Sequence, residues 1–323
     1  MPKRFTKAWK SYSDQLSLIT SRGIVVNDTD SATRFLSHVG YYRFTGYCLA
    51  FENGSRNVYV PNTTIEQIEY AYDFDHKLRD LLNEGLEVVE VDLRTSVAYY
   101  FGEKHGCFGH TKESNFFKYI PPKHQRPSTR ASTKFVFDHA EWLEKLRDSA
   151  GRSKERFIKH FRDTYLEFPD LPIWVATEVM SFGWLSQMVE GMRDQDRGKI
   201  SARYGIDPHI LANWTHHLSV IRNACAHHAR VWDKTLSVLP SLPRLDQPYG
   251  KYWRPPHLLQ NDRISAAILV VYQMLKKCQL DSDFAFDWKT RVSNLLKNLP
   301  NSPRASNRLG LSQEWDSNPL WSE

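Results

Sequence analysis

The sequence has little cysteine and no long hydrophobic run. Four of its 323 residues are cysteine, and no two of them form a CxxC pair. This spacing excludes a disulfide-stapled secreted scaffold and paired zinc-binding thiolates, so we expect free thiols in a reducing compartment. No apolar run approaches the roughly 18 residues of a membrane span, and the N-terminus lacks the apolar stretch of a signal peptide. We therefore expect a cytoplasmic protein with no membrane partner.

Acidic residues are outnumbered by basic ones. The chain has 43 Lys and Arg against 37 Asp and Glu, for a net charge of +6, and 41% of its residues are hydrophobic. That content can build a core, and the length fits one large domain or two. The positive charge favours an anionic partner, although a mild excess is also common on ordinary proteins. No internal repeat is visible, and no helix-turn-helix signature accompanies the basic residues, which argues against a double-stranded DNA binder.

Apolar residues recur at helical spacing through most of the chain, which predicts an all-α fold. The clearest helix begins at Thr63 or Thr64, with Glu66 placed for a capping box, and runs to about Phe101. Asp262 is the expected cap of a later helix. We expect further helices at residues 12–22, 28–38, 135–168 (with a break near 149–151 as an alternative), 174–193, 197–204, 207–232, 262–277 and 288–299. The sequence thus suggests an N-terminal helical region (1–60), a helical bundle with basic loop insertions (61–300) and a disordered tail (301–323).

The stretch 211–232 carries six polar groups suited to acid–base and phosphate chemistry: His216, His217, Arg222, Asn223, His227 and His228. It has no Gly or Pro, so we expect one continuous helix. Wound at about 100° per residue, the helix buries an apolar face that includes His217 and His228. Its other face presents Arg222 and His227, and Asn223 can contact His227 four residues on.

An arginine and a histidine placed in this way suit RNA cleavage. Arginine holds phosphate through a planar fork, and histidine can move a proton near neutral pH. RNA carries its own nucleophile, the 2′-hydroxyl, so a protein needs a proton acceptor, a proton donor and positive charge at the phosphate. The pattern alone is short, however. Taken alone, it also fits a structural interpretation, in which Arg222 is a solvated or ion-paired helix residue and His227 a residue at a helix C-terminus.

The segment from Arg222 to Trp232 resembles the C-terminal signature of the abortive-infection Abi-D/F proteins, members of the HEPN superfamily, which is marked by Arg-x4–6-His. Further blocks resemble this family in the same order along residues 10–240: 21–24, 35–47, 74–79, 87–94 and 181–186. The resemblance implies an all-helical HEPN-like bundle with additional N-terminal helices. It also implies a toxin-like role in phage defence and ribonuclease chemistry without a metal or cofactor. Members of the family also resemble toxins controlled by a small regulatory RNA, so the activity is expected to be restrained either by such an RNA or by a protein.

One chain offers one clear Arg–His pair, whereas cleavage needs both a base and an acid. A two-fold homodimer would bring two pairs into one cleft, which is also the arrangement that the resemblance implies. We expect His227 to transfer the proton, Arg222 to hold the scissile phosphate, and Asn223 to orient His227 or bind the phosphate. The product would carry a 2′,3′-cyclic phosphate. His228 and His216 are weaker candidates, because each also has a structural interpretation.

Two further residues bear on this site. Glu90 either pairs with Arg94 on the surface or reaches Arg222 across the bundle and fixes its guanidinium. Ala229 stands where HEPN toxins silenced by nucleotidyl transfer carry a tyrosine, which argues against that form of control. The rival function is a non-catalytic RNA-binding or scaffold protein, which needs the basic face and the dimer seam but not His227.

Basic residues outside the motif are candidates for RNA contact or for a merely solvated face: Arg152, Lys154, Arg156, Lys159, Arg162 and Arg230. A proline-containing basic loop at 118–134 has the same two interpretations. Aromatic residues at 40–47 could stack on bases or form a core seam. His105, Cys107 and His110 invite a zinc interpretation, but no second ligand pair follows at matching spacing, so we expect an ordinary loop.

Overall fold

The computed structural model describes residues 4, 6, 8–117, 137–247, 250–278 and 282–322, so the basic loop expected at 118–134 lies outside the described residues. The described chain forms fourteen α-helices and no strand, which confirms the predicted all-α class. The helices are α1 (Tyr12–Ser21), α2 (Thr29–Val39), α3 (Tyr41–Cys48), α4 (Ile65–His105), α5 (His139–Arg152), α6 (Arg156–Thr164), α7 (Ile173–Val179), α8 (Phe182–Gly191), α9 (Asp194–Tyr204), α10 (Pro208–Ala226), α11 (Ile264–Leu275), α12 (Ser282–Leu296), α13 (Ala305–Leu309) and α14 (Pro319–Ser322).

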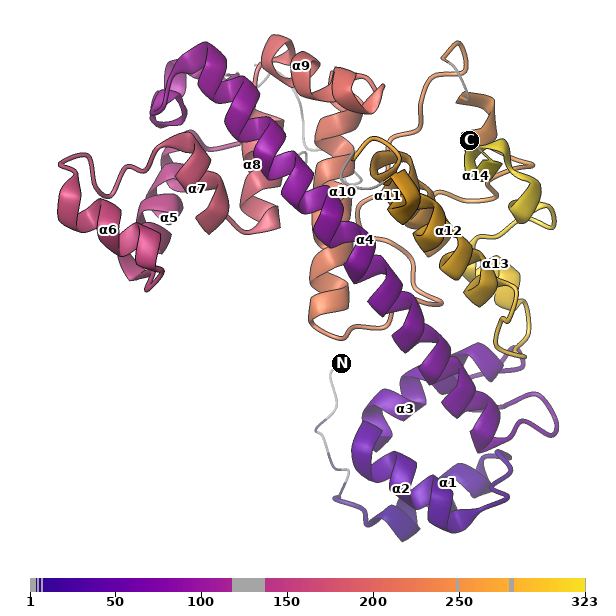
Figure 1. Ribbon diagram of the computed structural model, residues 1–323. Coiled ribbons are helices and arrows are strands. Elements are labelled where there is room, and N and C mark those ends of the chain that lie inside the picture. Colours follow the sequence, from indigo (N-terminus) through magenta and orange to yellow (C-terminus); the bar gives the residue numbers. More distant parts are fainter. Residues whose placement is uncertain are drawn as a thin grey trace.

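The 41-residue helix α4 is the axis of the molecule. At 1.5 Å per residue it is about 60 Å long, and it runs from α1–α3 at one end of the molecule to α7 and α9 at the other (Figure 1). Thr64 caps its start in a capping box with Gln67, rather than with the expected Glu66. An apolar stripe along α4 faces the core. Six of its residues are fully buried: Leu78, Leu82, Leu86, Val89, Leu93 and Val97.

Helices α11 and α12 pack closely against the middle of α4. The approach is closest at Gly85, where an added Cβ would lie 2.8 Å from Val271 Cγ1 and 2.9 Å from Trp288 Nε1. The indole of Trp288 is fully buried and donates a hydrogen bond to the Leu81 carbonyl at 2.6 Å. A side chain at position 85 would force Val271 or Trp288 to shift.

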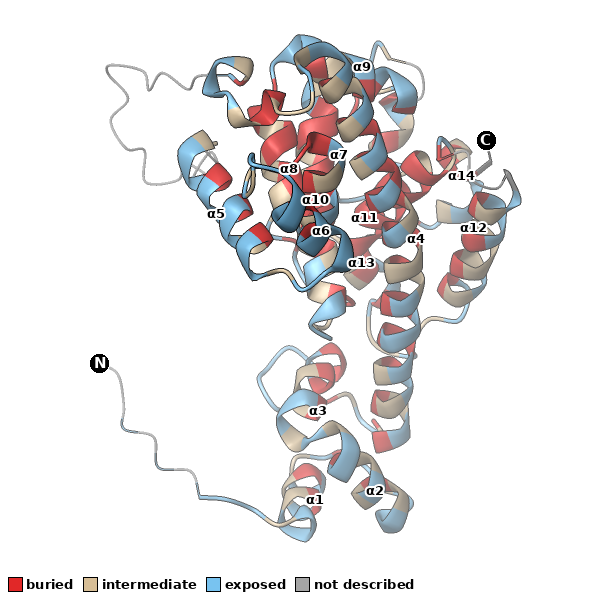
Figure 2. Cartoon of the chain, turned by 60° about the vertical axis from the view of Figure 1, so that its left-hand side comes forward, coloured by how far each residue is buried: buried red, intermediate tan, exposed pale blue. Residues whose placement is uncertain are grey.

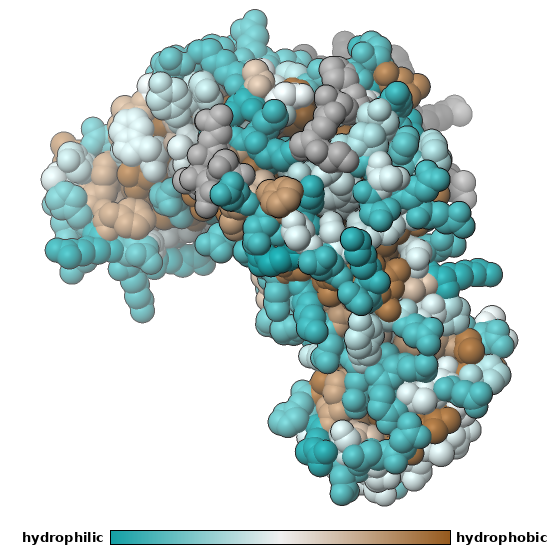
Figure 3. All heavy atoms as spheres, turned by 45° about the vertical axis from the view of Figure 1, so that its right-hand side comes forward, coloured by the Kyte–Doolittle hydropathy of each residue, from teal (hydrophilic) through white to brown (hydrophobic). Residues whose placement is uncertain are grey.

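Helix α10 lies in the interior and packs against α8, α9, α4 and α11. Buried residues concentrate on these helices, while the outer faces of α5, α6 and α12 are exposed (Figure 2). Helix α11 is buried on every side from Ile264 to Tyr272, as expected for a helix that is hydrophobic all round. Hydrophilic side chains cover most of the face shown in Figure 3, and hydrophobic ones gather on the lobe formed by α5–α7. Within the described chain, no helix is both long and apolar enough to cross a membrane.

Two expected helices are each divided in the structure. The helix expected at 174–193 breaks at Met180, whose backbone is extended, and Ser181 then caps α8 by accepting from the Trp184 N–H at 3.2 Å. The helix expected at 135–168 breaks at residues 153–155, somewhat later than the alternative near 149–151. In both cases a serine supplies local hydrogen bonds in place of a glycine or proline signal.

The C-terminal region differs most from expectation. Helix α11 begins after Arg263 with no side-chain cap, so the assignment of Asp262 as its cap is wrong. The disordered tail expected at 301–323 does not hold for the described residues up to 322. Leu309 and Trp321 are buried there, and the ring of Trp321 stacks on Tyr272 with centroids 5.4 Å apart. Serine, asparagine and proline dominate the composition of this segment, but a few large apolar residues are enough to anchor it to α11.

Candidate functional site

Helix α10 ends well before Trp232, the last helical residue expected from the sequence. It stops at Ala226, and His228 adopts a left-handed backbone conformation with φ of 54°. The His228 N–H donates to the Cys225 carbonyl at 3.0 Å and the Ala229 N–H to the Ala224 carbonyl at 2.8 Å. These two bonds form a Schellman motif, which usually has glycine at the left-handed position. The prediction of one helix through Trp232 is therefore wrong, because the terminating residue is a histidine that carries no sequence signal for a stop.

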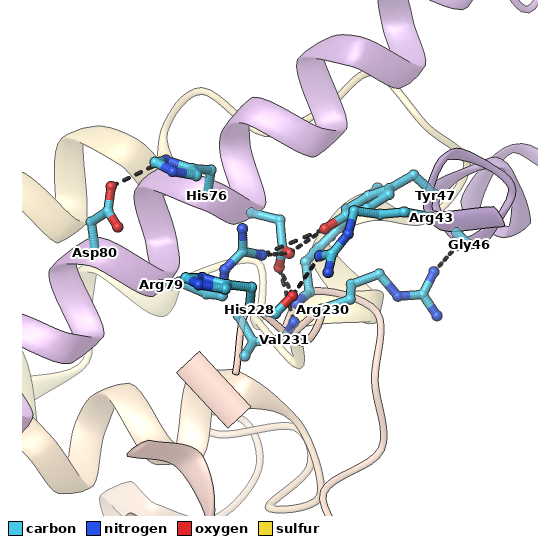
Figure 4. A network of polar contacts seen from close by, with 11 residues as sticks. Arg43, Gly46, Tyr47, His76, Arg79, Asp80, His228, Arg230 and Val231 are labelled. Carbon is cyan, nitrogen blue, oxygen red and sulfur yellow. Dashed lines mark hydrogen bonds and ion pairs between the residues drawn. The ribbon is translucent and has the colours of Figure 1, made fainter. Parts of the chain in front are cut away.

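A buried carboxylate holds the chain beyond this turn. Asp75 in α4 accepts hydrogen bonds from the N–H groups of Val231 at 3.0 Å and Trp232 at 2.7 Å, and from the Tyr47 hydroxyl at 2.7 Å. Arg79, one helical turn along α4, forms an ion pair with the same carboxylate (Figure 4). Burial raises the pKa of Asp75, and Arg79 together with the three donors opposes that rise. The network thus joins α3, α4 and the segment that follows α10.

Two arginines strengthen the connection between this turn and α3. Arg43 donates from Nη1 to the His228 carbonyl at 2.5 Å. Arg230 donates to the Gly46 carbonyl and lies over the Tyr47 ring, 5.8 Å from its centroid (Figure 4). Arg230 was expected to contact RNA, but its guanidinium is instead engaged in holding α3 against the body of the protein.

Arg222 faces α4 and meets Glu90 there. Its Nε lies 3.4 Å from Glu90 Oε2, while Arg94 forms an ion pair with the other oxygen of the same carboxylate. Arg94 also donates to the Thr177 carbonyl in α7. The two arginines line a hollow of about 330 Å³ together with Asn83, Glu87 and Val91. The expected contact between Glu90 and Arg222 is present, and so is the alternative pair with Arg94, because one carboxylate serves both.

The guanidinium of Arg222 keeps part of its hydrogen-bonding capacity. The side chain is 38% exposed, and its two terminal amino groups have no partner among the described residues. A guanidinium that is paired through Nε still presents these amino groups as a fork, the geometry that matches two phosphate oxygens. The arrangement can therefore bind a phosphate from solvent without losing its contact with Glu90.

The histidines of this region occupy different environments. His227 and His228 are exposed at the turn that ends α10, so the prediction of a buried His228 is wrong. Asn223 is also exposed, and within the described residues its side chain makes no hydrogen bond to His227. His216 is half-buried and has a partner. His217 is fully buried and bonds the Val238 carbonyl through Nδ1 at 2.7 Å, and burial lowers its pKa to about 4.

The basic residues of α5 and α6 divide into free and engaged side chains. Lys154, Arg156 and Lys159 are exposed around the start of α6, and Arg152 is exposed with one weak bond to the Asp148 carbonyl at 3.3 Å. Arg162 donates to the carbonyls of residues 150 and 151 and lies over the Phe168 ring at 4.9 Å. Arg162 thus caps the carbonyl groups at the C-terminal end of α5, whereas the side chains of Arg152, Lys154, Arg156 and Lys159 are accessible to RNA.

The segment with His105, Cys107 and His110, a candidate zinc site in the sequence, packs at the C-terminal end of α4. His105 lies 3.1 Å from Asp196, which also pairs with Lys104. His110 is fully buried, and burial lowers its pKa to about 4. Over the described residues, no group of three or more His, Cys, Asp and Glu side chains is placed to hold a metal ion.

Sequence reasoning missed the role of Asp75 and Arg79. Asp75 and Arg79 lie four residues apart beside Phe74 and Leu78, on the apolar side of α4. A charged pair at helical spacing within an apolar stripe is a signal for a buried ion pair, and it could have indicated this network. Its backbone partners could not be inferred, because they depend on where α10 ends.

Comparison with known proteins identifies the chain at the level of its family. The family model described as Abi-like protein matches residues 34–233. The matched region begins in α2 and ends just after the Asp75-bound segment, so it contains the hollow and the turn with His227. No curated protein and no solved structure gives a significant match. Because the matched region covers more than half of the sequence, the chain belongs to the family of Abi-like proteins.

Proposed function

We propose that the protein is an endoribonuclease that acts in abortive-infection phage defence. The observation that carries the proposal is the placement of Arg222: its Nε lies 3.4 Å from Glu90 at the edge of a hollow, and its terminal amino groups make no hydrogen bond within the described residues. His227 is exposed five residues further along the same segment. Family membership and the resemblance to HEPN proteins support the biological role and a mechanism that needs no metal.

The proposed reaction uses the RNA strand as its own nucleophile. His227 of one protomer removes the proton from the 2′-hydroxyl, and the 2′-oxygen forms a bond to phosphorus. The bond from phosphorus to the 5′-oxygen breaks, and a second histidine donates a proton to that oxygen. Arg222 stabilises the charge that develops on the non-bridging oxygens. The products carry a 2′,3′-cyclic phosphate and a 5′-hydroxyl, and Asn223 assists by orienting His227 or binding the phosphate.

A second copy of the chain would supply the second histidine. His227 and His228 lie at one exposed turn, and Arg43 constrains the backbone of that turn through the His228 carbonyl. We therefore propose a two-fold dimer in which both turns meet at one phosphate, with His228 supporting its neighbour. The exposed basic residues at the start of α6 would contact the RNA backbone. Control by a small regulatory RNA stays a prediction from the resemblance.

The proposal is tested with purified protein and mixed RNA in EDTA. Wild type is expected to give fragments with cyclic phosphate ends, and Arg222→Ala and His227→Ala to give none while folding and assembly are unchanged. His209→Ala, at an exposed histidine near the opposite end of α10, is the matched control and should leave the cleavage unchanged. Cleavage by His227→Ala would refute the assignment of the proton-transfer residue, and tight binding of intact RNA by wild type would favour a scaffold function.

A further inference from the structure

A second hollow lies between α4 and α7, next to the one that Arg222 lines. Its volume is about 470 Å³. Two large aromatic side chains line it, Tyr99 from α4 and Trp174 from α7, and they are 66% and 56% exposed. Between them the two helices approach so closely that a Cβ on Gly102 would lie 3.1 Å from Ile173 Cγ2. The hollow is thus walled by aromatic rings, and part of its lining is a glycine without a side chain.

The two hollows are joined through Arg94. This residue lines the first hollow, and its guanidinium donates to the carbonyl of Thr177, which lines the second. Along α4, Val91 lines the first hollow and Thr95, one helical turn further on the same face, lines the second, so about 6 Å of helical rise separates them. A strand whose phosphate is bound at Arg222 can therefore place a neighbouring nucleotide in the second hollow.

The charged residues of the second hollow indicate what it binds. Glu103 is neutralised by Lys199, whose Nζ lies 2.7 Å from its carboxylate. Glu178 is exposed and makes no ion pair or hydrogen bond within the described chain, so its two oxygens are free acceptors. Aromatic rings offer stacking surfaces to any unpaired base. A free carboxylate adds selectivity for a base edge with two adjacent donors, and among the RNA bases guanine has such an edge, at N1–H and the 2-amino group.

We propose that this hollow is a subsite for one unpaired guanine of RNA, stacked against Trp174 and Tyr99 and hydrogen-bonded by Glu178. The inference rests on the proposed function and specifies its substrate as single-stranded RNA with a guanine near the scissile phosphate. Pairing of that guanine in a duplex would occupy its N1–H and 2-amino donors, so double-stranded RNA is excluded from the subsite.

Direct binding tests the subsite without depending on cleavage. The probe is a short labelled oligoadenylate with one central guanine, compared with the same strand carrying inosine, which lacks the 2-amino group. Binding is measured by fluorescence anisotropy with His227→Ala, which leaves the strand intact. The guanine strand should bind about ten-fold more tightly than the inosine strand, the effect of one charge-assisted hydrogen bond. Glu178→Gln should abolish this difference, and Trp174→Leu should weaken both strands by about ten-fold or more.

Control variants distinguish recognition of guanine from non-specific RNA binding and from a contact between copies of the chain. Phe286→Leu removes an equally exposed aromatic ring from α12 and should leave binding unchanged. A guanine preference that survives Glu178→Gln would overturn the proposal. So would a Trp174→Leu variant with unchanged RNA binding and an altered molar mass in light scattering, which would make this face a contact between copies. Cleavage by wild type without guanine preference would refute the subsite alone, whereas guanine binding without any cleavage would refute the ribonuclease alone.

Discussion

The ion pair between Asp75 and Arg79 permits a quantitative test of how the turn after α10 is anchored. Both side chains are buried, and Asp75 also accepts from Tyr47 and from two backbone N–H groups. Asp75→Asn keeps the shape but places an amide N–H among donors and leaves the guanidinium without a counter-charge. Removing one partner of a buried pair costs about 3–5 kcal/mol. That is a large part of the roughly 5–15 kcal/mol by which a typical domain is stable.

Arg79→Met should cost less stability than Asp75→Asn, because a buried carboxylate that has lost its partner can be neutralised and a buried guanidinium cannot. In Arg79→Met, Asp75 can take up a proton, since burial already raises its pKa. Arginine cannot release its proton in this way. When the pKa of a carboxyl group is higher in the folded than in the unfolded protein, the group contributes stability at low pH, and this contribution is lost as the pH rises. The stability deficit of Arg79→Met should therefore shrink as the pH is lowered from about 7 to about 5.

Urea unfolding of wild type, both single variants and the double variant measures the effect. The double variant should be more stable than the sum of the single losses predicts, because it contains no isolated charge. Additivity within roughly 0.5 kcal/mol would contradict the account of a coupled pair. A deficit of Arg79→Met that does not change with pH would contradict the proposed protonation of Asp75.

Three further outcomes are expected. Gly85→Ala should lower the unfolding free energy by about 1–3 kcal/mol despite the better helix propensity of alanine, and a stabilised variant would show that α4 and α11 separate easily here. His217 has a folded pKa of about 4, below its ordinary value, so its contribution to stability is complete above pH 6.5 and is lost as the pH falls toward 4. His217→Asn should therefore remove up to roughly 3 kcal/mol of pH dependence from urea unfolding, and an unchanged pH profile would contradict this. Glu90→Gln removes the charge that Arg222 and Arg94 share and should slow RNA cleavage about ten-fold or more, whereas unchanged cleavage would show that Arg222 does not depend on Glu90.

Much of the fold could be predicted because its signals are local. The apolar spacing of α4 and the expected helix starts near residues 28, 64 and 207 are visible in the sequence, and the structure confirms these helix starts. The break at Met180 could not be found in this way. It depends on a serine cap within an otherwise apolar run, and serine is compatible with a helix or with its start.

The candidate site was only partly predictable, because its contacts join residues that are far apart in the sequence. The contact of Glu90 with Arg222 joins residues far apart in sequence, and the family resemblance made it one of two interpretations. The end of α10 could not be inferred, because a histidine takes the left-handed position and distant groups hold the chain beyond it. Nor could the sequence show that the guanidinium of Arg230 bonds the Gly46 carbonyl and is therefore not available to RNA.

Single-turnover cleavage of two matched RNA strands shows whether the 2′-hydroxyl of the RNA is the nucleophile. One strand is all RNA, and the other has a single 2′-deoxynucleotide at the position where the first is cut. Wild type is expected to cleave the all-RNA strand in EDTA to a cyclic phosphate and to leave the deoxy-substituted bond intact, whereas His227→Ala is expected to cleave neither strand. Equal cleavage of both strands would contradict the account, because the nucleophile would then be water and not the 2′-hydroxyl.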